Sequence, residues 1–287
     1  MSGIVITGYA SLDHVVVLDG AIRSGRTTTI VGRSEKAWPR LGGGPAYVAQ
    51  AVRTTYLGLV APISWIGKDA TGQIYLSHLA ARNISAIGVA QVEGARTPIA
   101  ILAYDPNGDC ACLYDPGLPP TIGLDDDQRQ LIRNADWIVV TIGPAVVTDE
   151  ILSMIRPDQK LAWIVKNDPR AITPVQMAAL IGRADLIFCN GREREFLHGA
   201  SKEGTRRKDQ LIIETQGRRG AFFLRHGKSL LVPAQPIDVA DPTGAGDTFA
   251  GGVIAAMMNG ETDLQAIGFA GNASARALLL ERKSEES

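Results

Sequence analysis

The sequence predicts an α/β fold in which a central, mostly parallel sheet is flanked by helices and carries a small β-rich addition. From about residue 120 onward, short apolar runs alternate with amphipathic segments, which is typical of a parallel sheet covered by helices. Two segments, about 12–40 and about 97–116, are instead β-rich and broken by turns. Near the carboxyl end, a glycine-flanked turn enters a helix within residues 241–252. We expect residues 1–287 to form a single domain.

The composition allows a sizeable core and gives no sign of a nucleic-acid or membrane partner. The chain has 287 residues, 45% of them hydrophobic, and a formal net charge of -1, which gives no electrostatic footprint for nucleic acid or an anionic membrane. The amino terminus lacks the features of a signal peptide and no apolar run has membrane length, so we expect a cytoplasmic protein. The three cysteines are expected to be reduced thiols; they are Cys110, Cys112 and Cys189.

Two turns in the first quarter of the chain lead into helices. Gly42, Gly43 and Gly44 precede residues 45–52, which fit a helix. Residues 65–72 fit a strand followed by a turn and a helix start. Both turns are therefore expected to join a strand to a helix.

Three buried strands are predicted in the middle of the chain, at residues 137–140, 161–165 and 186–189. Each run is nearly continuous in apolar residues, which indicates burial on both faces of the sheet. Acidic residues predict helix starts at Asp125 ahead of the first strand and at Thr148 ahead of the second.

The last strongly patterned segment combines a turn, a helix start and a carboxylate. Apolar residues at helical spacing predict that the helix begins at or just after Gly244, which would leave the backbone N–H groups of Ala245, Gly246 and Asp247 unpaired. Those donors and the positive end of the helix dipole favour an anion. Asp247 would lie where it can take a proton from an attacking hydroxyl. A plain turn before a helix is the alternative interpretation.

Residues 241–252 resemble the signature of the ribokinase-like, or PfkB, family of carbohydrate and nucleoside kinases, and several other segments match that family in the same order. The resemblance implies a ribokinase-like fold and an ATP-dependent kinase that uses Mg²⁺ and transfers the γ-phosphoryl group to a hydroxyl of a small sugar. It implies that Asp247 is the base, that residues 244–246 hold the phosphate, and that the β-rich segments form a lid over the sugar site.

The same resemblance implies a set of substrate-binding residues. Asp13 matches the carboxylate that binds substrate hydroxyls, and Gly42 and Gly43 match a turn that brings backbone close to them. Tyr47 stands where the family commonly has an Asn, and its ring could also stack on a base or a sugar face. A turn or capping role for Asp13 and a bare glycine turn are the alternatives.

Nucleotide and metal contacts are implied by three further segments. Thr215 and Gly217 resemble a turn that binds nucleotide phosphates, and Asn272 belongs to a helix that would lie beside the adenine. Asn190 and Glu193 resemble an element whose Glu acts through water on the magnesium region. The alternatives are a tight turn, simple helix packing, and a helix-opening Asn followed by a solvated Glu.

Two other functions stay open at the level of sequence. One is a nucleoside kinase of the same family, to which Tyr47 is a hint, and the other is a non-catalytic ligand sensor, against which the intact Asp247 argues. Neither a Walker phosphate loop nor a dinucleotide fingerprint is present. The sequence does not identify the acceptor, it makes a monovalent-cation site doubtful, and it leaves a homodimer through the lid as a possible assembly.

Overall fold

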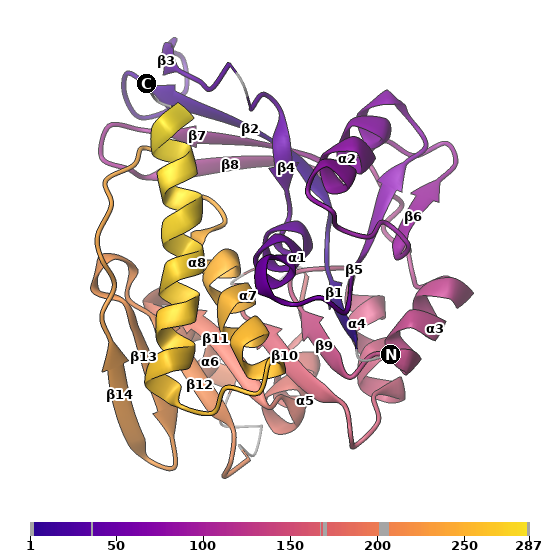
Figure 1. Ribbon diagram of the computed structural model, residues 1–287. Coiled ribbons are helices and arrows are strands. Elements are labelled where there is room, and N and C mark those ends of the chain that lie inside the picture. The colour runs from indigo at the N-terminus through magenta and orange to yellow at the C-terminus, as the bar shows by residue number, and fades with distance from the viewer. Residues whose placement is uncertain (1–2, 36, 167, 169–170, 201–206, 286–287) are drawn as a thin grey trace.

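The structure is a computed structural model that describes residues 3–35, 37–166, 168, 171–200 and 207–285. Its main sheet has nine strands in the order β14-β13-β12-β11-β10-β9-β1-β5-β6 (Figure 1). All neighbours from β12 to β6 are parallel, whereas β13 and β14 are antiparallel at one edge. The strands are β1 (Gly3–Thr7), β5 (Leu59–Gly67), β6 (Val89–Val92), β9 (Trp137–Val140), β10 (Lys160–Ile164), β11 (Leu186–Asn190), β12 (Leu211–Thr215), β13 (Ala221–Arg225) and β14 (Lys228–Val232).

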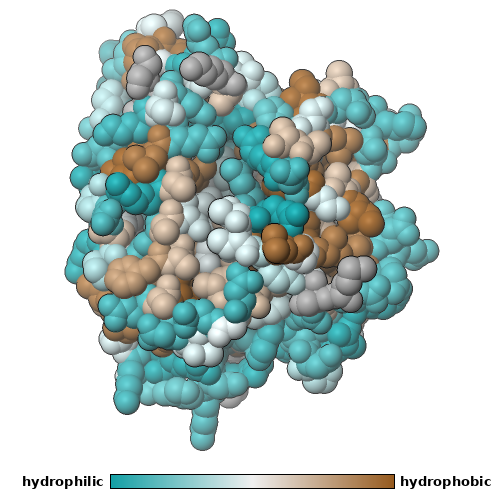
Figure 2. Space-filling view, viewed as in Figure 1, coloured by the Kyte–Doolittle hydropathy of each residue, from teal (hydrophilic) through white to brown (hydrophobic). Residues whose placement is uncertain are grey.

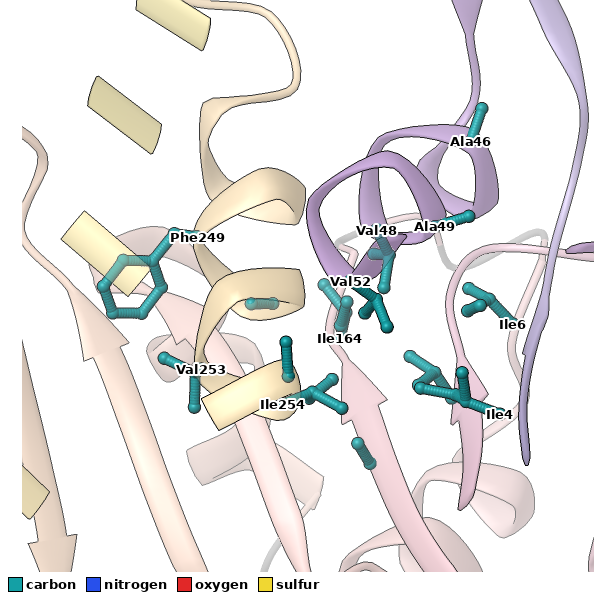
Figure 3. Close-up of a cluster of buried hydrophobic side chains, with 14 of the residues drawn as sticks. Ile4, Ile6, Ala46, Val48, Ala49, Val52, Ile164, Phe249, Val253 and Ile254 are labelled. Carbon is teal, nitrogen blue, oxygen red and sulfur yellow. The ribbon is translucent and has the colours of Figure 1, made fainter. Parts of the chain in front are cut away.

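Helices cover both faces of this sheet because successive strand residues point to opposite sides. Ile4 and Ile6 enter one core and Val5 enters the other. The first core includes side chains from α1 (Gly44–Thr55), α2 (Ala70–Ala81), α7 (Ala245–Met258) and α8 (Leu264–Glu285); the second includes side chains from α3 (Asp126–Asn134), α4 (Ala145–Met154), α5 (Pro174–Arg183) and α6 (Gly191–Ala200). Figure 3 shows α1 and α7 side by side over the strands that carry Ile4, Ile6 and Ile164.

The β-rich segments form a second, five-stranded sheet beside the main one (Figure 1). Its strands are β2 (Ser11–Leu18), β3 (Ile30–Gly32), β4 (Arg40–Gly42), β7 (Ile99–Tyr104) and β8 (Cys110–Asp115). The registers place Arg40, Asp13, Ala100 and Tyr114 in one row across four strands. Directly paired residues project to the same face, so these four side chains share one face of the second sheet.

The predicted fold class is confirmed, and one predicted helix start is wrong. The three strands expected in the middle of the chain are β9, β10 and β11, and Asp125 caps α3 through a hydrogen bond from the Gln128 N–H. Helix α4, however, begins at Ala145 rather than at Thr148. Because α4 begins at Ala145, its first turns bury both Val147 and Thr148. The free energy gained by this burial outweighs the preference of the acidic residues after Thr148 for a first helical turn.

The surface of the face in Figure 2 is mainly hydrophilic, with hydrophobic groups in separate patches. Within the described ranges, no helix is both long enough and apolar enough to cross a bilayer.

Candidate active site

The first turn of α7 is shaped by Gly244. Gly244 precedes the helix with φ of 81°, a left-handed conformation that favours glycine. A Cβ added to Gly244 would lie 2.5 Å from Cε1 of Tyr47, so the turn and the tyrosine ring are in close contact. A Cβ added to Gly246 would meet no atom within 4 Å, so there is open space beside this first turn.

One of the three backbone donors expected to be free at this turn is used. The N–H of Ala245 donates to the carbonyl oxygen of Pro242 at 3.1 Å. The expectation was wrong for Ala245 because the chain makes a tight turn immediately before the helix. The first-turn donors of Gly246 and Asp247 stay the candidates for binding an anion.

Asp247 is buried in that first turn, with 7% of its surface exposed. Nζ of Lys166 lies 3.1 Å from each of its carboxylate oxygens and donates a hydrogen bond to Oδ2. Oδ1 accepts no hydrogen bond from the described part of the chain. A buried carboxylate oxygen without a donor is available to an incoming hydroxyl.

Lys166 was not singled out from the sequence. It follows β10 at the carboxyl end of the strand, and the only sequence signal for it was that position. Burial lowers the pKa of its ammonium group, but the charges of Asp247 and Glu193 outweigh burial and leave the pKa above its ordinary value. Lys166 is therefore a cation that pairs with Asp247 and is further stabilised by the charge of Glu193.

Asn190 and Glu193 form a reciprocal cap at the start of α6. The N–H of Asn190 donates to Oε2 of Glu193 at 2.9 Å, and the N–H of Glu193 donates to Oδ1 of Asn190 at 3.0 Å. Burial raises the pKa of Glu193, although Lys166 opposes that shift. The described residues contain no cluster of three or more His, Cys, Asp or Glu side chains suited to a metal ion. Glu193 thus has a helix-capping role whatever else it binds.

Asp13 lies on β2 and is almost fully buried, with 3% of its surface exposed. It accepts hydrogen bonds from the hydroxyls of Ser11 at 2.6 Å and Tyr47 at 3.3 Å. Burial raises the pKa of Asp13 to about 6, against the opposing effect of those two donors. A Cβ on Gly42 would lie 2.1 Å from Asp13 Oδ1, so only glycine leaves room for the carboxylate there.

Tyr47 joins Asp13 to the turn before α7. Its hydroxyl donates to Asp13 and its ring contacts Gly244. Burial, followed by the charge of Asp13, raises the pKa of Tyr47 well above its ordinary value, so the phenol stays neutral. Gly43 precedes α1 and lies in the turn that brings Tyr47 to this position.

Two further contacts tie the second sheet to the turn before α7. The Tyr104 hydroxyl lies 2.6 Å from Oγ1 of Thr243. Arg40 of β4 bonds Asp241 and lies 3.0 Å from Oε2 of Glu285 in α8. These links were not predicted, because each joins residues far apart in the sequence.

The three residues expected to bind nucleotide meet around one cavity. Thr215, Gly217 and Asn272 line a cavity of about 320 Å³ that also includes Ala245 and Gly246 of α7. The structure therefore brings the expected nucleotide residues to the start of α7, and Tyr47 connects that turn with Asp13 on the other side. The expected site residues form two groups that share the Gly244 turn.

A parallel sheet covered on both faces, with a glycine-led helix start, is an architecture that binds phosphate-bearing ligands in α/β proteins. The profile of the pfkB family carbohydrate kinases matches residues 1–287, and the chain belongs to that family. It is accordingly an ATP-dependent phosphotransferase of the carbohydrate-kinase type.

Individual relatives are similar at low identity. The ATP-dependent ribose-1-phosphate kinase of Halopiger xanaduensis is 28% identical over 219 residues, which are 75% of this chain and 72% of that protein. The crystal structure of ribokinase from Cryptococcus neoformans var. grubii serotype A in complex with ADP has a TM-score of 0.81 at 22% identity and covers 97% of this chain and 94% of that one. A nucleoside kinase of Methanocaldococcus jannaschii has a TM-score of 0.78 at 18% identity, covering 98% and 92%.

Proposed function

We propose that this protein transfers the γ-phosphoryl group of ATP, with Mg²⁺, to a hydroxyl of a small sugar in the cytoplasm. Asp247 is the base, and the observation that carries the proposal is its place in the first turn of α7. There its carboxylate is buried, keeps Oδ1 free of hydrogen bonds and lies beside open space at Gly246. A base poised at a helix start can face both the acceptor and the phosphate.

The two groups of site residues divide the binding work. Asp13 accepts hydrogen bonds from the acceptor hydroxyls, with Gly42 and Gly43 leaving room for the sugar. Thr215, Gly217 and Asn272 bind the nucleotide in the 320 Å³ cavity. The N–H groups of Gly246 and Asp247 hold the transferred phosphoryl group between them. The second sheet acts as a lid that keeps water from the acceptor.

Asp247 takes the proton of the acceptor hydroxyl as that oxygen attacks phosphorus. Phosphoryl transfer depends mainly on positioning and on stabilising charge, so a single well-placed base and a set of donors suffice. The carboxylates around Lys166 fit a hydrated magnesium ion, since Mg²⁺ keeps several waters and is held largely by phosphates. Magnesium, when bound, neutralises phosphate charge. Glu193 would orient its water, with Asn190 holding that carboxylate in place through the cap.

The direct test is Asp247→Asn. The change keeps the size of the side chain but removes the proton acceptor, so turnover should fall by roughly 10²–10⁴-fold with little change in nucleotide affinity. A coupled assay of ADP release over a panel of sugars gives turnover, and calorimetric titration gives ATP affinity. A variant that still phosphorylates its acceptor within a few-fold of wild type would remove Asp247 from the mechanism.

A nucleoside acceptor is the second candidate, and a pair of tyrosines favours it. Tyr114 shares a row with Asp13 across the small Ala100, and two strand spacings put its Cα roughly 10 Å from that of Asp13. Its ring centroid lies 6.0 Å from that of Tyr9, and 41% of Tyr114 is exposed. A sugar held by Asp13 could therefore place an attached base against these rings.

A substitution of Tyr114 on β8 distinguishes a nucleoside acceptor from a sugar acceptor. If the acceptor is a nucleoside, Tyr114→Leu should lower kcat/KM for nucleosides by about tenfold and leave free sugars unchanged, because only the base contacts the ring. Leu113→Ala is the matched control, since Leu113 is exposed and projects from the opposite face of the same strand. Equal effects of Tyr114→Leu on both substrate classes would return Tyr114 to a packing role.

A further inference from the structure

Lys166 occupies a place that its ion pair alone does not explain. It lies past the carboxyl end of β10, the edge of a parallel sheet at which ligands bind in open α/β folds. Its side chain is 33% exposed, whereas that of Asp247, its partner, is 10% exposed. Part of the Lys166 side chain is thus reachable from solvent, while its ammonium group pairs with the buried carboxylate.

Without Lys166, the negative charges of Asp247 and Glu193 would lack this nearby cation. Asp247 and Glu193 both raise its pKa, which means that both carboxylates act on the same ammonium group. A triphosphate arriving at the start of α7 brings several more negative charges to this place. Lys166 is the cation that the structure places against the base, and its long, flexible stem lets the ammonium turn from one anion to another.

We propose that Lys166 is a catalytic residue that binds the γ-phosphoryl group, and this inference rests on the function proposed above. In the structure its ammonium group donates a hydrogen bond to Asp247. When ATP is bound, it donates to a γ-phosphate oxygen and frees the carboxylate to receive a proton.

Lys166 then stays on the phosphoryl group during transfer. The bond between the β,γ-bridging oxygen and the γ-phosphorus breaks, and its electron pair leaves with ADP. A bond forms between that phosphorus and the acceptor oxygen, whose proton goes to Asp247. Lys166 keeps its own proton and stabilises the charge on the phosphoryl oxygens throughout.

The test compares two nucleotides that differ by the γ-phosphate. Calorimetric titration measures the affinities of ADP and of a non-hydrolysable ATP analogue for the wild-type protein and for Lys166→Met. The variant should bind ADP as the wild type does and should lose about 10- to 100-fold in affinity for the analogue, as expected for a lost charge-assisted hydrogen bond. Lys166→Arg should recover part of that loss, because its guanidinium still donates to phosphate.

Lys160→Met is the matched control. Lys160 begins the same strand, lies 3.4 Å from Asp185 and is 55% exposed, so its loss should change neither affinity. A turnover assay with the best acceptor should show a lower kcat for Lys166→Met and a normal one for Lys160→Met.

Three results would overturn the inference. Equal losses for ADP and the analogue would mean that Lys166 only supports the fold of the site. An unchanged analogue affinity would mean that the ammonium never reaches the γ-phosphate, and so would a normal kcat for the Met variant. A wild-type protein that binds the analogue through Lys166 but phosphorylates no acceptor would instead refute the proposed function and leave this contact intact.

Discussion

At the scale of single residues, the site depends on carboxylates that the fold makes costly to ionise. Asp13 is the clearest case, since burial raises its pKa to about 6 while two hydroxyls oppose the shift. Its ionised form is the better acceptor of hydroxyl hydrogen bonds. Asp13, the residue that we propose binds the acceptor, therefore titrates at about pH 6, where the Asp and Glu side chains of most proteins are already charged.

Acceptor use should follow the ionisation of Asp13. As the pH rises through about 6, the carboxylate becomes charged, so kcat/KM for the acceptor should increase between pH 5 and 7 and then level off. Measuring kcat/KM for the acceptor and for ATP between pH 5 and 7 tests this prediction. Asp13→Asn should abolish the rise for the acceptor. A midpoint below about 5 would show that another group controls binding.

Asp13 should also lower the stability of the protein at neutral pH. Its folded pKa is above the unfolded value of about 3.9, so the folded state binds the proton more tightly and stability falls as the pH rises from about 4 to 6. Asp13→Asn should therefore raise the free energy of unfolding at pH 7.5 by about 1–3 kcal/mol and change it little below pH 4. Urea unfolding at both pH values measures this. A variant destabilised at pH 7.5 would contradict it.

Glu193 combines a structural role with the proposed metal role, and Glu193→Gln separates them. Gln at this position preserves a reciprocal helix cap, so the fold should be unaffected. Loss of the charge should raise the Mg²⁺ concentration needed for half-maximal rate several-fold. Arg192→Gln, one residue away and exposed, is the control. Unaltered magnesium dependence would leave Glu193 with its capping role alone.

At the scale of elements, the start of α7 controls both halves of the site. Gly244 contacts Tyr47, and through it Asp13, while Gly246 faces open space and lines the 320 Å³ cavity. The two glycines lie in the same turn yet have different surroundings. Substitutions at the two positions should accordingly have different effects.

Gly244→Ala should destabilise the protein, whereas Gly246→Ala should not. At Gly244 the left-handed backbone and the contact with Tyr47 should together cost about 1–3 kcal/mol of unfolding free energy. At Gly246 alanine suits the helix and meets no neighbour, so stability should stay within about 0.5 kcal/mol while ATP affinity falls. Thermal unfolding and nucleotide titration distinguish the two. Normal ATP affinity of Gly246→Ala would argue against phosphate beside this turn.

Elements were predicted better than the contacts between them. The strands at 137–140 and 186–189 were recognisable because burial on both faces leaves a continuous apolar run. Asp247 was recognisable because its turn and helix are contiguous in sequence. Lys166 was missed because its partner is 81 positions away, and no local pattern marks a pair that only the fold brings together. The helix start predicted at Thr148 was wrong because α4 begins three residues earlier and buries Thr148, whatever its acidic neighbours favour.

At the scale of the whole molecule, a buried cluster of charges joins the second sheet to α8 and to the turn before α7. Arg40, with a side chain that is 6% exposed, bonds both Asp241 and Glu285, and Arg282 lies 3.8 Å from Asp241. The cluster connects β4, beside Asp13, to the turn before Gly244.

Pairing of two copies of the second sheet into a homodimer stays a prediction.

Arg40→Met should destabilise the protein by about 3–5 kcal/mol, because it leaves two buried carboxylates with fewer counter-charges. Lys68→Met is the control, since it breaks an ion pair with Glu93 that is exposed on both sides and should change stability by less than about 1 kcal/mol. Scanning calorimetry measures both. Similar melting temperatures for the two variants would mean that Arg282 compensates for the loss.

The span of this cluster along the chain bears on how the protein is made. Asp241 lies 201 positions after Arg40, and Glu285 lies 245 positions after it. At about 5–20 residues per second, a ribosome needs at least about 10 s after making Arg40 to supply its first partner. During that interval the nascent second sheet holds a guanidinium that cannot yet be buried favourably. If the proposed site is right, neither substrate assists the folding of the amino-terminal half during synthesis, because that site is completed only when α7 and α8 have been translated.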